Sequence, residues 1–170
     1  MKSSINVQEK ELRRLLKFLH TIGAIGLMGS MASLLVLLSF LPPVASLAEY
    51  TAFRAAMGAI ATWIFFPSLG VTLIAGLVAI AYSRAYHSAG WAWAKALSGV
   101  LLFESGFVSV LGPMQQEAAR SSAALAGKAD PTILAASLVA ERNTLWILLA
   151  VAAFNVAFGI WRPRLTRLPD

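Results

Sequence analysis

Four long apolar segments divide the chain, and each is long enough to cross a membrane as a single helix. They run over about residues 15–41, 52–82, 91–111 and 144–161. A transmembrane helix needs about 20 mostly apolar residues. The pattern therefore predicts an all-α polytopic membrane protein, in which a bundle of four transmembrane helices forms a single integral membrane domain over residues 1–170.

Prolines indicate where these segments should bend or end. Pro42 and Pro43 follow the first segment and should stop its helix, because proline lacks an amide N–H and crowds the preceding turn. The second segment is longer than a span requires, so it should tilt, protrude or kink at Pro67. The third segment should end at Gly112-Pro113.

The long connection between the third and fourth segments, residues 114–143, has a helical composition. Its first half begins with a proline and is rich in alanine, "GPMQQEAARSSAALAG", which favours a helix. Its second half places Asp130 as an N-cap and Pro131 at the first helical position. We expect a helical hairpin between helices 3 and 4 that protrudes on the non-cytoplasmic side.

The overall composition agrees with a membrane protein. The chain is 58% hydrophobic and 13% charged, whereas soluble domains average about 45–50% apolar and about 25% charged residues. It has no cysteine, which excludes disulfides, thiolate metal ligands and a cysteine nucleophile.

The formal charge of +6 is explained by topology and needs no nucleic-acid partner. With four spans, one side of the membrane receives ten of the 14 basic residues: Lys2, Lys10, Arg13, Arg14, Lys17, Arg84, Lys95, Arg162, Arg164 and Arg167. Cytoplasmic segments carry an excess of lysine and arginine. Both termini are therefore predicted to be cytoplasmic, in a bacterial inner (plasma) membrane, with the basic side in contact with anionic lipid.

His20 lies inside the first apolar segment, "LLKFLHTIGAIGLMGS", about 9 Å along the helix. An ionisable residue at membrane depth is costly and is a functional candidate. Gly23 and Ala24 lie one turn further on the same face, where a flat group would find space, and neutral imidazole is a common axial ligand of haem iron. The alternative is a histidine that bonds to a neighbouring helix, with Gly23 and Gly26 allowing close helix packing.

Three further ionisable residues have both a functional and a structural interpretation. Lys95 either anchors the third helix at the interface beside Trp91 and Trp93 or points inward at the depth of His20. Glu104 lies about 180° around the helix from Lys95, so the two cannot line one narrow pocket. Glu104 is either a neutral acid bonded to a neighbouring helix or a proton carrier or ion ligand. His87 is a solvated loop residue or a second haem ligand.

The order of three motifs resembles a bacterial family of predicted four-helix integral membrane proteins of unknown function. The motifs are "LLKFLHTIGAIGLMGS", "FFPSLGVTLIAG" and "GWAWAKALSGVLLF", within residues 12–112. That family is similar, more distantly, to the copper-resistance CopD domain and to HemJ-type protoporphyrinogen oxidases.

This resemblance implies haem b on the cytoplasmic half of the bundle. HemJ-type proteins carry a histidine in an "LH" step and a lysine in a "W..K" step, which correspond here to His20 and Lys95. The chain departs from HemJ in having "TIGAIGLMG" after the histidine and "FLPPV" at the end of the first span. What carries over is a haem-binding or quinone-linked redox role, and not the oxidation of porphyrinogen.

Three functions follow as hypotheses. The first is a membrane oxidoreductase that binds haem b through His20, with Lys95 near a propionate, Glu104 moving protons, and a quinone or a redox protein as partner. The second is a cofactor-free structural or assembly subunit whose small-residue faces bind other helices, as a homo-oligomer or in a complex. The third is a metal or small-solute permease, which four spans without a ligand cluster support least.

Overall fold

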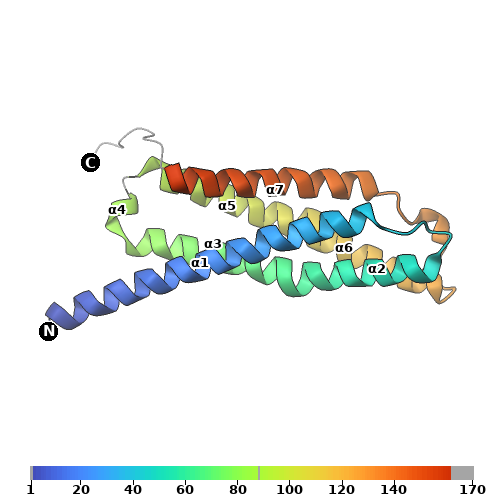
Figure 1. Ribbon diagram of the computed structural model, residues 1–170, viewed down its shortest axis with the longest axis horizontal. Coiled ribbons are helices and arrows are strands. Elements are labelled where there is room, and N and C mark those ends of the chain that lie inside the picture. The colour runs from blue at the N-terminus through green and yellow to red at the C-terminus, as the bar shows by residue number, and fades with distance from the viewer. Residues whose placement is uncertain (1, 88, 162–170) are drawn as a thin grey trace.

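The computed structural model describes the backbone of residues 2–87 and 89–161, and these residues form no β-strand. They fold into four long helical rods that lie side by side (Figure 1). Each rod is long and apolar enough to cross a membrane. The predicted all-α class and the four long apolar helices are therefore confirmed.

The first two rods are joined by a short loop. The first rod is α1 (Lys2–Ser39), and it ends before Pro42, as predicted. The second rod consists of α2 (Leu47–Ile60), the π-helical turn η1 (Ala61–Phe65) and α3 (Phe66–Tyr82), which follow one another without a break.

The third rod is likewise interrupted by a π-helical turn. It comprises α5 (Gly90–Gly106), η2 (Phe107–Leu111) and α6 (Gly112–Leu125), and the fourth rod is α7 (Leu138–Trp161). Two short elements lie in the connections: the helix α4 (Arg84–His87) and the 3₁₀ turn η3 (Pro131–Ile133).

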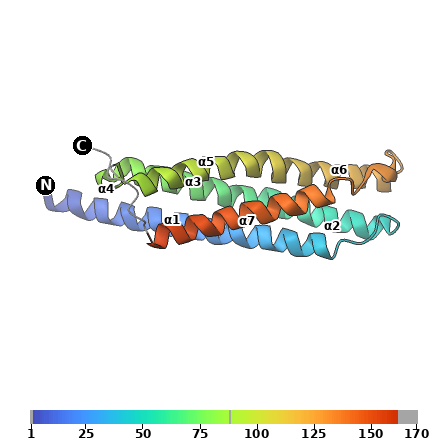
Figure 2. The same ribbon diagram turned by 90° about the horizontal axis from the view of Figure 1, so that it is seen from above.

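The rods pack as a bundle with two different ends (Figures 1 and 2). α1 packs against α3 and α7, and α5 packs against α3 and α7. We call the end that holds α4 and the start of α1 the terminal end. At the opposite end, which we call the loop end, α2 packs against α6.

Each π-helical turn ends two residues before a proline. In η1 the Phe66 amide donates to the carbonyl of Ala61, and Pro67 follows. Because proline donates no N–H and crowds the preceding turn, the wider turn lets the helix continue where an α-helix would break. Instead of only a kink at Pro67, the structure has a local change of helix type.

The sequence predicts that the third helix ends at Gly112-Pro113, and this prediction is wrong. The helix continues because a π-helical turn again precedes the proline. The Gly112 amide donates to the carbonyl of Phe107, and α6 continues to Leu125. The proline then occupies the first turn of a new helical segment, where its missing N–H costs nothing.

The connection between the third and fourth rods is only partly helical. α6 ends at Leu125, and Gly127 has a positive φ of 69°, which glycine adopts without strain. Asp130 is the N-cap predicted from the sequence, since its carboxylate accepts a hydrogen bond of 2.8 Å from the Thr132 amide. It caps a single 3₁₀ turn and not an α-helix, and α7 begins at Leu138.

The main hydrophobic core follows the axis of the bundle. Its most buried side chains come from all four rods: Leu27, Met31, Leu34, Met57, Phe65, Leu69, Val110, Met114 and Leu145. A smaller core at the loop end contains Tyr50, Ala124 and Leu134.

Two glycines of α1 allow it to approach α3 closely. A Cβ on Gly23 would lie 2.9 Å from the Thr72 nitrogen and 3.0 Å from the Ser68 carbonyl oxygen. A Cβ on Gly26 would overlap the Ser68 hydroxyl. Because the atoms opposite Gly23 belong to the backbone, they cannot move aside without moving α3.

We therefore expect Gly23→Ala to lower the free energy of unfolding in detergent by about 1–3 kcal/mol, the usual cost of overpacking. Gly29→Ala is the matched control, because Gly29 lies on the same helix and a Cβ there meets no atom within 4 Å. This control should be neutral or stabilising by up to about 1 kcal/mol. Equal losses of stability in the two variants would show that helix proximity at Gly23 is unimportant.

Candidate functional site

A small cavity in the terminal-end half of the bundle gathers polar side chains from all four rods. Its volume is about 80 Å³. The residues that line it are His20, Ala24, Leu27, Met28, Thr72, Lys95, Leu102, Ala152, Asn155 and Val156. We call this space the polar cavity.

His20 points into the bundle and is held by α3. Its Nδ1 lies 2.8 Å from the Thr72 carbonyl oxygen. A carbonyl can only accept, so Nδ1 donates to it, and in the neutral imidazole Nε2 is then the atom with the lone pair. The imidazole also lies against Gly76, where a Cβ would be 3.3 Å from Cε1 and from Nδ1. Both interpretations of His20 drawn from the sequence, a haem ligand and a bond to a neighbouring helix, require this inward orientation.

The two small residues above His20 have different surroundings. Ala24 lines the polar cavity. Gly23 is buried against Thr72 and Ser68 of α3. The space that its missing side chain leaves is therefore filled by another helix, and the same holds for Gly26. The small residues of this face pack within the chain, which removes them as a surface for an external partner.

Lys95 is half-buried and reaches towards α7. A Cβ on Gly159 would lie 2.5 Å from its Nζ, so the absence of a side chain at Gly159 makes room for the ammonium group. Trp93, two residues earlier, is exposed, and its indole donates to the His87 carbonyl oxygen at 3.0 Å. Lys95 therefore lies at the cavity, while the neighbouring tryptophan occupies the outer surface.

Asn155 connects α7 to α5 beside the cavity. Its Oδ1 accepts a hydrogen bond of 2.7 Å from the Ser98 hydroxyl, and its Nδ2 donates to the Val151 carbonyl oxygen at 3.1 Å. Both the oxygen and the nitrogen of the amide thus have hydrogen-bond partners within the chain. Through Ser98, Asn155 fixes the distance between α7 and α5, the helix that carries Lys95.

The other two ionisable residues singled out in the sequence lie elsewhere. Glu104 is exposed on the outer face of α5, and His87 is exposed on α4. Neither lines the polar cavity. The part of the chain that the structure describes contains no group of three or more histidine, aspartate and glutamate residues that could hold a metal ion.

Whether haem fits the polar cavity depends on donors and on space. His20 offers a free Nε2 supported by a hydrogen bond at the other ring nitrogen, as metal-binding histidines usually do. The space is too small, because about 80 Å³ is well below the 300–1,000 Å³ of pockets that hold drug-sized ligands. The helices as packed do not accommodate a macrocycle.

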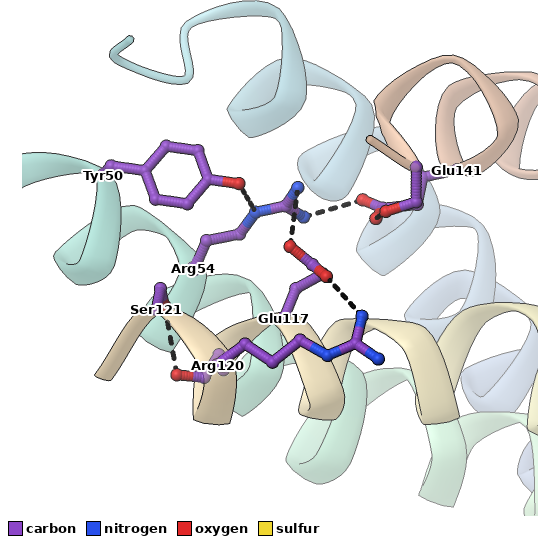
Figure 3. Close-up of polar contacts among 8 residues, drawn as sticks. Tyr50, Arg54, Glu117, Arg120, Ser121 and Glu141 are labelled. Carbon is purple, nitrogen blue, oxygen red and sulfur yellow. Dashed lines mark hydrogen bonds and ion pairs between the residues drawn. The ribbon is translucent and has the colours of Figure 1, made fainter. Parts of the chain in front are cut away.

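A second polar cluster lies towards the loop end and centres on Arg54 (Figure 3). Arg54 is 0% exposed. Its Nη1 donates to Glu141 Oε2 at 2.7 Å, and its Nε donates to the Tyr50 hydroxyl at 3.0 Å. The guanidinium also lies over the Tyr50 ring, 5.4 Å from its centroid. The cluster joins α2 to α7.

Glu117 of α6 completes this cluster. It forms an ion pair with Arg54 at 3.9 Å and accepts a hydrogen bond from Arg120 at 3.1 Å. Among the residues that the structure describes, Arg54 Nη2 and Glu117 Oε2 find no hydrogen-bond partner. A gap of 3.9 Å between two buried charged atoms is wide enough for a bridging water to serve both.

Glu141 and Ser137 extend the cluster into the segment that precedes α7. The Ser137 hydroxyl donates to Glu141 Oε1 at 2.5 Å, while the other carboxylate oxygen is held by Arg54. Both oxygens of this buried carboxylate are thus satisfied. The cluster therefore fixes the start of the fourth rod against the second.

The Arg54 cluster was not predicted from the sequence, because Arg54 was counted only among the basic residues of the non-cytoplasmic side, and Glu117 and Glu141 fell within the connection at residues 114–143. A signal was present in the helical periodicity. Arg54 lies on one helical face with Tyr50, Met57 and Ala61, all of which are buried. A charged residue within an apolar stripe must meet a charge of opposite sign on a packed neighbour.

We predict that Arg54→Met destabilises the protein by about 3–5 kcal/mol, because it leaves Glu141 buried without its cation. The matched control is Arg120→Met, since Arg120 is 53% exposed and pairs with Glu117 at the edge of the same cluster. It should cost less than about 1 kcal/mol. Denaturation in detergent, followed by circular dichroism, measures both. Similar losses in the two variants would mean that Arg54 is not a structural centre.

These structural features are the basis for any functional assignment, since comparisons with known proteins add none. No protein-family model, no curated protein and no solved structure matches the chain.

Proposed function

We propose that this protein crosses a bacterial inner membrane four times, with both termini in the cytoplasm and the loop end outside. Exposed aromatic residues, which are enriched at membrane–water interfaces, indicate where the two boundaries of the membrane lie along the rods. Trp63 and Tyr82 lie 19 residues apart on the second rod, and Trp146 and Trp161 lie 15 apart on the fourth. At 1.5 Å per residue these separations are about 28 and 22 Å; the first is close to the thickness of about 30 Å of the hydrocarbon core, and the second is somewhat shorter.

This placement separates the two polar clusters. Arg54 lies nine residues beyond Trp63 towards the loop end, or about 13 Å, so its cluster lies outside the hydrocarbon. The parts of α2, α6 and α7 nearest the loop end then extend beyond the membrane as helices. The polar cavity lies within the cytoplasmic half of the bilayer, where burying polar and ionisable groups is costly and indicates a functional role.

We propose that the polar cavity is the point at which the head group of a quinone binds, and that the helices around it move apart to admit the ring, since about 80 Å³ is also smaller than the usual ligand pocket. The observation that carries this proposal is the convergence of His20, Lys95 and Asn155, from three helices, on one cavity in an otherwise apolar bundle. An ammonium donor and an imidazole acceptor on one small cavity suit a ring that carries carbonyl groups when oxidised and hydroxyl groups when reduced.

Each side chain has a distinct part in this binding. Lys95 donates to a quinone carbonyl oxygen. His20 Nε2, with its free lone pair, accepts a hydrogen bond from a hydroxyl of the reduced form. Asn155 keeps α5 and α7 in register through Ser98 and does not need to contact the ligand. The polar groups of the cavity include no carboxylate, so a carbonyl oxygen meets no repulsion there.

Binding of a short-chain ubiquinone analogue to the purified protein tests this proposal, with tryptophan fluorescence quenching as the readout. Lys95→Met should weaken binding about tenfold, the effect of losing one charge-assisted hydrogen bond. Lys128→Met, at an exposed residue of the loop end, is the matched control and should bind like the wild type. Equal affinity in Lys95→Met and wild type, or no binding at all, would exclude the quinone site.

A second candidate function is haem b binding through His20, and one observation favours it. The Thr72 carbonyl holds the proton on Nδ1 and leaves Nε2 as a ligand atom. Because the helices as packed do not admit the macrocycle, this function requires α1 to separate from its neighbours on loading. When bound, haem would supply one-electron redox chemistry. In that case His20 Nε2 would hold the iron, and Lys95 would pair with a propionate.

An absorption spectrum after expression with a haem precursor tests this second candidate. If haem b binds, a Soret band should be present in the wild type and in His87→Ala and should be lost in His20→Ala. A wild-type preparation without a Soret band, or a band of equal strength in His20→Ala, would leave His20 as a polar contact between α1 and α3.

A further inference from the structure

Glu104 lies on the outside of the bundle at the depth of the proposed membrane interior. It is eleven residues from Trp93, or about 16 Å along α5, near the middle of a core of about 30 Å. Its side chain is exposed in the single chain. Of the acidic residues that the structure describes, it alone lies between the proposed membrane boundaries, where lipid offers a carboxyl group no hydrogen-bond partner.

Glu104 belongs to a regular stripe that runs along α5 and into the start of η2. Exposed residues recur at alternating intervals of three and four, at Ala94, Leu97, Leu101, Glu104 and Val108. Leu97, Leu101 and Val108 are 64%, 54% and 62% exposed. This spacing is the heptad pattern by which two helices interlock in a left-handed coil. We call this stripe the α5 seam, and no other helix of the described chain covers it.

Membrane topology limits what a second copy of the chain can place against this seam. Two copies inserted in the same orientation carry α5 in the same direction. A two-fold axis normal to the membrane then sets each seam residue opposite its own equivalent, at the same depth. A carboxylic acid that carries its proton has one donor and one acceptor face, so two of them satisfy each other without a cation.

We propose that two copies of the chain pair in parallel through the α5 seam, with the two Glu104 side chains hydrogen-bonded to each other across the axis. No basic residue of the described chain offers a competing partner on the outer surface at this depth. Lys95, the basic residue on the membrane part of α5, reaches towards α7 inside the bundle. A single polar residue in a heptad seam also fixes the register of the two helices.

Cysteine cross-linking in native membranes tests this pairing, because the chain contains no cysteine of its own. Leu101→Cys and Val108→Cys should form disulfide-linked dimers under mild oxidation. Ile74→Cys and Phe154→Cys are the matched controls, since both residues are equally exposed on other rods. Cross-linking at the controls to the same extent as at the seam would overturn the proposal, because it would indicate random collision.

Substitution of Glu104 tests its part in the pairing. Glu104→Gln keeps a donor and an acceptor and should preserve the dimer. Glu104→Ala should raise the dissociation constant of the dimer in detergent about tenfold. The change is on the surface, so the fold should be kept. The measurement is Förster transfer between labelled copies on dilution into detergent. An unchanged dissociation constant in Glu104→Ala would show that Glu104 does not join the copies.

Discussion

The close approach of α1 to α3 at Gly23 and Gly26 is the contact on which the arrangement of the terminal half depends. It brings the backbone of α3 within reach of the next turn of α1, and so places the Thr72 carbonyl against His20. A larger residue at Gly23 would move α3 outward and would remove that hydrogen bond. The tautomer of His20, and with it the chemistry open to the polar cavity, therefore follows from the size of a residue one turn away.

The two polar clusters satisfy the same physical constraint in different ways. At the loop end, Arg54 is neutralised by carboxylates from two other helices, which stabilises the contact of α2, α6 and α7. At the polar cavity, Lys95 and His20 face a space with no carboxylate among its lining residues. A closed ionic cluster is typical of a structural role. A cavity that gathers polar side chains from several helices is more typical of a binding site.

Much of the fold follows from the sequence because it depends on local patterns. Long apolar runs fix the four helices, Pro42 and Pro43 fix the end of the first, and Asp130 fixes a cap. The continuation of the third helix past Pro113 does not follow, because it depends on a π-helical turn that no single residue type specifies. Sequence patterns identify where a proline disturbs a helix but not whether the backbone absorbs the disturbance.

The polar sites are likewise predictable from the sequence only where they depend on local properties of the chain. The inward orientation of His20 follows from the cost of exposing an imidazole to lipid. Its partner does not, because the Thr72 carbonyl is a backbone group that any residue would provide. Arg54 and Glu141 lie 87 positions apart, and only the packed bundle brings them together.

The π-helical turns connect these two regions of the molecule. η1 and η2 contact each other inside the bundle, and each shifts the register of its rod just before a proline. Since an added residue per turn rotates everything beyond it, the faces of α2 and α6 are set relative to α3 and α5 by these turns. Beyond the turns, Arg54 of α2 and Glu117 of α6 form an ion pair at 3.9 Å, and on the other side Thr72 of α3 and Lys95 of α5 line the polar cavity. The two π-helical turns thus let the second and third rods continue past prolines that would end ordinary helices. One bundle can therefore carry an ionic cluster towards one end and a polar cavity within an apolar surface towards the other.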